Sequence, residues 1–169
     1  MKKMVRKKKE DKKSISNVLK FITMIAVSLL AGFIGSIFTT PSIAGWYREL
    51  VKPNFSPPNW IFAPVWICLY LLMGIAAFLV WRKQGKGMKM ALTFFFIQLA
   101  LNSLWSIIFF GAHNIMLAFF EIIILWIAIL ITTIRFFKIS KPAGWLMLPY
   151  IAWVSFATVL NLAFWILNL

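Results

Sequence analysis

The side chains in this sequence that could do chemistry are mainly indole rings, and three of them share helix faces with polar groups. Spacings of three and four residues group Trp66 with Tyr70, Trp105 with Asn102, and Trp153 with Asn161. Indole faces pack well against flat aromatic molecules. Indole is also readily oxidised, so a photoexcited ligand could take an electron from Trp66 or Trp153. The pattern predicts a cavity for a flat, largely apolar molecule.

Ionisable groups are scarce inside the apolar segments, where Glu121 is the one acid. An ionisable side chain in a membrane span is a functional candidate by default, although a protonated glutamate that only packs fits the same position. Arg48 and Lys52 lie between the first two apolar runs, where they could meet the carboxylates of a ligand.

Several familiar kinds of site are missing from the sequence. His113 is the only histidine and lies in a short connection, which leaves no metal-ligand cluster and makes it a poor haem ligand. No Ser–His–acid set and no phosphate-binding glycine loop is present. We therefore expect no metal site, no required cofactor, and neither an ordinary hydrolase nor a pump.

Composition indicates an integral membrane protein. The 169 residues are 62% hydrophobic, with a mean hydropathy of +0.88, whereas about half the residues of a soluble domain are apolar. The formal charge of +14 comes mostly from the first twenty residues and from the connections between apolar runs. That distribution argues against a nucleic-acid partner and for contact with the lipid bilayer.

Five apolar segments are long enough to cross a bilayer as helices. They lie near residues 21–38, 61–81, 88–110, 115–134 and 145–167. Basic residues concentrate in the N-terminal arm and in the second and fourth connections, so the positive-inside rule predicts a cytoplasmic N-terminus and an outer C-terminus. A signal peptide over the first run is the less favoured alternative.

The predicted fold is an all-α bundle of five transmembrane helices. Residues 1–20 are expected to be a basic, disordered arm, and residues 21–169 to be the membrane domain. Small residues at Ser28, Gly32 and Ser36 form a stripe that fits either a homodimer contact or close packing within the bundle.

The connection over residues 41–60 is rich in proline and tryptophan. We predict that it covers the outer mouth of the cavity, and that its prolines limit the conformations it loses on closing over a ligand. The cover residues are Trp46, Lys52, Pro53, Pro57 and Pro58. An interfacial belt is the alternative, because Trp and Tyr gather at bilayer surfaces.

Blocks of residues in a fixed order form a family signature. They read Trp46-Tyr47-x-x-Leu50-x-Lys52-Pro53-x-x-x-Pro57-Pro58-x-Trp60, Pro64-Val65-Trp66-x-x-x-Tyr70, Gln98-Leu99-x-Leu101-Asn102-x-x-Trp105 and Pro149-Tyr150-x-x-Trp153-x-x-Phe156-Ala157-x-x-Leu160-Asn161. From about residue 32 to residue 168 the chain resembles the TspO/MBR family, the tryptophan-rich sensory proteins and translocator proteins of the peripheral benzodiazepine receptor type.

The resemblance implies an often dimeric bundle that binds porphyrins such as protoporphyrin IX or haem, together with isoquinoline and benzodiazepine ligands. The family's pocket residues match Tyr47, Trp66, Asn102, Trp153 and Ala157 here. Helical spacing adds Trp105, Glu121 and Asn161 to the predicted ligand-binding set. Asn102 and Asn161 fit equally well as amides that only bond between helices.

Some family members are reported to promote light- and oxygen-dependent breakdown of protoporphyrin through two tryptophans, which match Trp66 and Trp153. These two are therefore the candidate catalytic residues. Residues 160–169 lack the tyrosine and basic residue of the animal cholesterol motif, so we expect no high-affinity cholesterol binding.

The combined prediction is a multi-pass protein of a bacterial plasma membrane that binds a tetrapyrrole and acts in sensing or regulation during stress or in tetrapyrrole homeostasis. Two alternatives stay open. One is a transporter that moves porphyrin across the membrane, and the other is an enzyme that degrades it by photo-oxidation.

Overall fold

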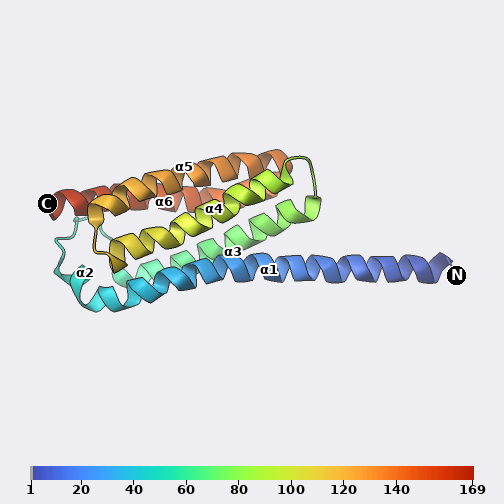
Figure 1. Cartoon of the computed structure of the whole chain (residues 1–169), viewed down its shortest axis with the longest axis horizontal. Helices are drawn as coiled ribbons and strands as arrows, with labels where there is room; N and C mark the ends of the chain where they lie inside the picture. Colours follow the sequence, from blue (N-terminus) through green and yellow to red (C-terminus); the bar gives the residue numbers. More distant parts are fainter. Residues whose placement is uncertain (1) are drawn as a thin grey trace.

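The computed structural model describes the backbone of residues 2–169 and the side chains of residues 14–169. This part of the chain is helical and contains no strand (Figure 1). The helices are α1 (Lys2–Ala44), α2 (Trp46–Glu49), α3 (Asn59–Lys83), α4 (Met88–Ser106) with a π-helical turn η1 (Ile107–Gly111), α5 (Ile115–Ile139) and α6 (Lys141–Leu167).

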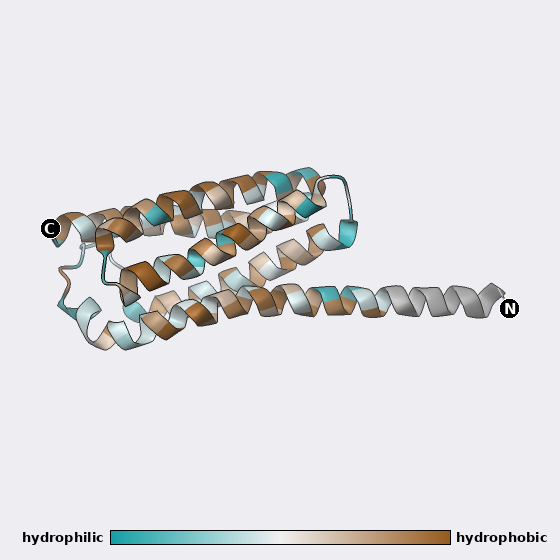
Figure 2. Cartoon of the chain, viewed as in Figure 1, coloured by the Kyte–Doolittle hydropathy of each residue, from teal (hydrophilic) through white to brown (hydrophobic). Residues whose placement is uncertain are grey.

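Five of these helices are long and apolar enough to cross a membrane, which confirms the predicted architecture. The spans are Ser14–Ala44, Asn59–Lys83, Met88–Gly111, Ile115–Ile139 and Lys141–Leu167. Apolar residues cover most of the helix surfaces, and hydrophilic residues gather at the connections (Figure 2). The side of the membrane that each terminus faces stays a prediction.

The helices extend beyond the predicted apolar segments. α1 continues to Ala44, with Pro41 inside it, rather than ending near residue 38. α6 begins at Lys141 rather than near residue 145, because Pro142 lies in the first turn, where its missing N–H leaves no bond unmade. α5 continues to Ile139 beyond the apolar run. α3 begins at Asn59 and contains Pro64.

The predicted disordered arm falls mainly on residues 1–13, which lie outside the part of the chain whose side chains are described. Ser14–Lys20 are helical and continuous with the first span. The division of the chain at residue 20 therefore stays a prediction.

The bundle has two ends of different character. The α3–α4 and α5–α6 connections lie at one end (Figure 1), here called the basic end because it carries Lys83, Lys86 and Lys141. The other end carries α2, the extended segment 50–58, the η1–α5 connection and the C-terminus (Figure 1). It is called the cavity end for the reason given below.

Small side chains and fully buried rings fill the half of the bundle toward the basic end. Ala76, Ala77 and Val80 on α3 have no exposed surface, and neither does Phe95 on α4. Gly74 brings α3 against α1, because a Cβ at this position would come within 2.9 Å of the Ile25 Cα atom. This half is closely packed and leaves the opposite half to hold any ligand.

Candidate ligand-binding site

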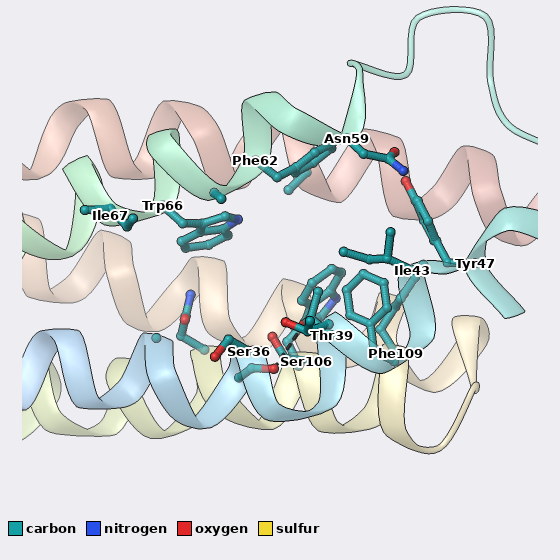
Figure 3. A pocket seen from close by; sticks show the side chains of 18 of the residues that line it. Ser36, Thr39, Ile43, Tyr47, Asn59, Phe62, Trp66, Ile67, Ser106 and Phe109 are labelled. Atoms are coloured by element: carbon teal, nitrogen blue, oxygen red, sulfur yellow. Dashed lines mark hydrogen bonds between the residues drawn. The ribbon is translucent and has the colours of Figure 1, made fainter. Parts of the chain in front are cut away.

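A cavity of about 410 Å³ lies among the helices at the cavity end (Figure 3). This volume falls in the range of about 300–1,000 Å³ that is usual for small-molecule sites. The lining comes from α1, α2, α3, α4, η1 and α6 and is mostly apolar. Figure 3 shows Trp66 projecting from α3 into the space between α3 and α1.

Most of the residues predicted to bind ligand meet around this one cavity. The lining includes Tyr47 from α2, Trp66 from α3, Asn102 and Trp105 from α4, and Trp153, Ala157 and Asn161 from α6. Side chains with three- and four-residue spacing on separate helices thus point toward a common space, as the sequence analysis expected.

Glu121 is the predicted site residue that lies elsewhere. It sits on α5, it is 6% exposed, and it is not among the residues that line the cavity. Neither of its carboxylate oxygens has a hydrogen-bond partner among the described residues. The geometry fits the packing alternative for this side chain better than contact with a ligand in the cavity.

The walls of the cavity are aromatic rings that other aromatic rings hold in place. The Trp66 ring stacks on Tyr70, with ring centroids 5.6 Å apart and an interplanar angle of 30°. The Trp105 ring stacks on Phe109 at 5.0 Å. Trp153 meets Phe62 edge to face at 6.0 Å. Contacts of this kind fix the orientation of each indole ring before a ligand arrives.

A chain of hydrogen bonds connects three helices beside the cavity. The Tyr70 hydroxyl donates to Asn102 Oδ1, and Asn102 Nδ2 donates to the Tyr150 hydroxyl at 3.2 Å. The Tyr150 hydroxyl donates in turn to Gln98 Oε1 at 2.9 Å. Asn102 therefore bonds between helices and lines the cavity as well, so the two roles left open for it occur together.

Asn161 also fills both roles. Its Oδ1 accepts a hydrogen bond from Trp105 Nε1 at 3.0 Å, and its Nδ2 donates to the Ile115 carbonyl at 3.0 Å. The amide is thus paired within the protein, and it orients the Trp105 ring toward the cavity. A ligand here meets the surface of Asn161 rather than a free donor.

The Trp153 indole N–H differs from these paired groups. It is buried and has no hydrogen-bond partner among the described residues, although Trp153 lines the cavity. A buried N–H without an acceptor costs about 1–3 kcal/mol. The atom has almost no accessible surface, so Trp153 meets the cavity with its ring and not with this N–H.

The predicted cover lies at the cavity end but mostly outside the lining. Trp46, Lys52, Pro53, Pro57 and Pro58 do not line the cavity. Tyr47 does, and the Lys52 ammonium lies 4.5 Å from the centre of the Tyr47 ring. Burial raises the pKa of the Tyr47 phenol, so this group stays protonated at neutral pH. The segment therefore contributes Tyr47 to the cavity lining, and it places the Lys52 ammonium against the Tyr47 ring.

Two contacts that hold the start of the cover segment against η1 and the η1–α5 connection were not predicted from the sequence. The Trp46 ring stacks on His113, with ring centroids 4.3 Å apart. The Ser42 hydroxyl donates to the Phe110 carbonyl at 2.6 Å, which ties the end of α1 to η1. A π-helical turn has no compositional signature, so η1 could not be read from the residues, although such turns are frequent at functional sites.

Some lining residues were also missed. They include Ile43, Asn59, Phe62, Gly35 and Thr39. Phe62 precedes Trp66 by four residues, and that spacing is a signal that could have identified it. The α1 residues carried a weaker signal, because small side chains in a membrane helix fit a helix contact as well as a cavity wall.

Two of the three residues in the small-residue stripe pack within the bundle, whereas Ser36 is exposed and lines the cavity. Ser28 is fully buried, and its hydroxyl donates to the Met24 carbonyl at 2.8 Å. A Cβ added to Gly32 would overlap the Tyr70 ring. Ser28 and Gly32 therefore fit the alternative of close packing within the bundle. The homodimer stays a prediction.

Comparisons with known proteins agree with this geometry. The model of the TspO/MBR family matches residues 24–166. The tryptophan-rich protein TspO of Archaeoglobus fulgidus is 43% identical over 152 residues, covering 90% of this chain and 99% of that protein. Protein CrtK of Rhodobacter capsulatus is 36% identical, with 87% and 94% covered. The human translocator protein is 38% identical, with 80% and 82% covered. The chain therefore belongs to the TspO/MBR family.

Proposed function

We propose that this protein binds a tetrapyrrole in the cavity between its helices and acts as a sensory or regulatory protein of the bacterial plasma membrane. The observation that carries the proposal is the convergence of Trp66, Trp105 and Trp153 on a single cavity. Relatives named for a tryptophan-rich sensory function support the regulatory role.

The chemistry of the walls selects the ligand. Asn102 and Asn161 are already paired, so the cavity offers mainly the aromatic faces of its tryptophans. A flat aromatic macrocycle fits such walls. Each ring-to-ring contact adds about 0.5–1.5 kcal/mol beyond the burial of apolar area. Isoquinoline and benzodiazepine ligands present similar flat surfaces.

The carboxylates of a porphyrin also have partners at the mouth. Arg48 is exposed on α2, and Lys52 lies against Tyr47 in the cover segment. A propionate beside either cation forms a charge-assisted contact, and such contacts are stronger than those between neutral groups. The macrocycle would then lie among the tryptophans with its charged edge toward the cover.

Photo-oxidation is the second candidate function, and the placement of Trp66 and Trp153 in one lining favours it. A photoexcited porphyrin between them can accept an electron from either indole, which leaves an indole radical cation and a porphyrin radical anion. Dioxygen from the air is the oxidant that breakdown of the macrocycle then consumes. Phenylalanine keeps the aromatic surface but is much harder to oxidise. We therefore expect Trp66→Phe and Trp153→Phe to retain most protoporphyrin IX binding and to lose light-dependent bleaching of the porphyrin absorption band.

Titration of protoporphyrin IX into nanodisc-embedded protein, followed by tryptophan quenching and then illumination in air, tests both functions. Trp145→Phe is the control, because Trp145 is 65% exposed and lies outside the lining. Parent-like bleaching by both pocket variants would remove the redox role. Loss of binding in both would mean that the indoles act by shape alone. Absence of saturable binding by the parent protein would overturn the tetrapyrrole proposal.

Transport is tested separately. Porphyrin flux into proteoliposomes should not exceed that into empty liposomes if the protein binds without transporting. Saturable flux that Ala157→Phe blocks would favour the transporter instead.

A further inference from the structure

The basic end of the bundle carries cations without acids. Among residues 14–169 the acids are Glu49, in α2 at the opposite end, and Glu121. Glu121 lies 14 residues before Arg135 on α5, which corresponds to about 21 Å along the helix. The positive charges of this end therefore have no carboxylate to pair with in the described part of the chain.

The basic side chains at this end contact aromatic rings and a backbone carbonyl instead of carboxylates. Lys20 lies 5.6 Å from the centre of the Trp81 ring, and Arg82 lies 5.6 Å from that of Phe78. The Lys83 ammonium donates to the Ile139 carbonyl at 3.0 Å. These contacts position the cations against the bundle but leave their charge uncompensated.

Arg135 has the most specific environment of the set. Its guanidinium carbon lies 4.9 Å from the centre of the Phe94 ring, so the side chain bridges from α5 to α4. Its Nε–H is buried and has no hydrogen-bond partner among the described residues. Lys138 follows one turn later on the same side of α5 and is exposed. Arg135 is only partly buried, and its guanidinium charge has no carboxylate partner among residues 14–169, so an external anion can take that role.

Phosphate is the group that fits this donor set. A guanidinium presents parallel N–H donors that match two phosphate oxygens, and the neighbouring ammonium adds a third contact. Arg135 lies four residues before the end of α5, about 6 Å inside the end of the helix. At that depth a basic side chain reaches the headgroup layer, where the available phosphates belong to lipids.

We propose that the surface of α4 and α5 at the basic end, centred on Arg135, binds the phosphate of an anionic phospholipid. A net negative headgroup such as phosphatidylglycerol is favoured over phosphatidylcholine. The described residues at this end offer no carboxylate to meet a choline or amine group. Electrostatic attraction from the surrounding lysines adds to the preference.

This site is independent of the cavity. Phe94 lies eight residues before Asn102, the nearest predicted cavity residue on α4, or about 12 Å along that helix. Neither Arg135 nor Phe94 lines the cavity. Variants at Arg135 should therefore leave porphyrin binding unchanged, and porphyrin binding serves as a check that each variant has folded.

The test uses the full chain in detergent, titrated with phosphatidylglycerol, phosphatidylcholine or inorganic phosphate. Native mass spectrometry measures bound lipid, and a thermal melt measures the shift in Tm. The parent should bind phosphatidylglycerol about tenfold more tightly than Arg135→Gln, since one charge-assisted contact is of that order. Arg135→Lys, which keeps the charge but loses the fork of donors, should fall between them. Lys138→Gln should lose less than Arg135→Gln.

Arg48→Gln is the matched control, because it removes one arginine charge from the opposite end of the bundle. It should bind phosphatidylglycerol like the parent. Equal losses in Arg48→Gln and Arg135→Gln would show a general charge effect and overturn the site. So would equal affinities for phosphatidylcholine and phosphatidylglycerol. Stabilisation by inorganic phosphate that matches the lipid would identify a soluble anion as the ligand and contradict the lipid assignment.

Discussion

The same helices form a closed half and a hollow half, and their side chains explain the difference. Toward the basic end, Ala76, Ala77 and Val80 interdigitate with neighbouring helices and leave no exposed surface. Toward the cavity end, Trp66 and Trp153 pack one face against other rings and leave another face beside the cavity. In the closed half Phe95 stacks on Phe136 and both rings are fully buried, whereas the rings at the cavity end stack on one another and leave a space between them.

The two ends also treat polar groups differently. Beside the cavity, Asn102, Tyr70 and Tyr150 satisfy one another, so the walls are set before ligand binding. At the basic end, Arg135 has an unpaired N–H and no nearby acid in the described chain. A preorganised, neutral cavity suits a flat apolar ligand, whereas uncompensated cations suit phosphate. Substitutions that disturb the packing or the hydrogen bonds of the cavity end should therefore change porphyrin binding.

The largest effect is expected from Gly32→Leu. The new side chain would overlap the Tyr70 ring, displace Tyr70 from Asn102 and enter the cavity. Overpacking of this kind costs about 1–3 kcal/mol, so we expect a lower Tm in detergent and loss of porphyrin binding.

Gly45→Ala is the control for that variant, because a Cβ at position 45 meets nothing within 4 Å. Parent-like stability and binding in Gly32→Leu would show that the hollow half is not rigid.

Asn102→Ala should have the next largest effect. It leaves the Tyr70 and Tyr150 hydroxyls without their shared amide, at a cost of about 1–3 kcal/mol. The free energy of unfolding, measured by denaturant titration in micelles, should fall by that amount. Ser36→Ala is the comparison, because the Ser36 hydroxyl bonds only to Phe33 of its own helix and its loss should change little. Equal stability of the two variants would contradict a structural role for the network.

The cover segment should affect kinetics more than stability. Replacing Pro57 and Pro58 with glycine gives the open cover more conformations to lose. The entropic cost of closing over a ligand should therefore rise by about 0.4–1 kcal/mol per site. Porphyrin release, followed by stopped-flow fluorescence, should therefore quicken by about fourfold or more. Pro142→Gly, at the opposite end of the bundle, should leave release unchanged. Unchanged release in the Pro57/Pro58 variant would favour the interfacial-belt alternative.

Glu121→Leu should have the smallest effect on ligand binding. Both carboxylate oxygens lack partners and the side chain lies outside the cavity lining. Exchanging an unsatisfied buried polar group for an apolar one of similar size is often neutral or stabilising. We expect unchanged porphyrin affinity and an equal or higher Tm. A marked loss of affinity would restore Glu121 to the ligand site.

Residue type and helical spacing were enough to predict the five spans and most of the cavity. Bulky rings such as Trp66, Trp105 and Trp153 mark one face of each helix, and that face must lie inside the bundle. The same reasoning grouped Glu121 with the cavity residues, but its side chain is not among those that line the cavity. Spacing on α5 does not fix the rotation of that helix relative to the others. The residues that α1 contributes to the cavity wall could not be identified, since small side chains in a membrane helix fit a helix contact as well as a cavity wall.

Occupancy of the cavity by protoporphyrin IX is tested most directly by filling the cavity from one position. Ala157 lines it from α6, whereas Ala152 lies on an exposed face of the same helix. In a titration followed by tryptophan quenching, Ala157→Phe should bind about tenfold to a hundredfold more weakly than the parent, because the ring occupies the ligand's space. Ala152→Phe should bind like the parent. Parent-like binding by Ala157→Phe would show that the porphyrin lies elsewhere on the protein.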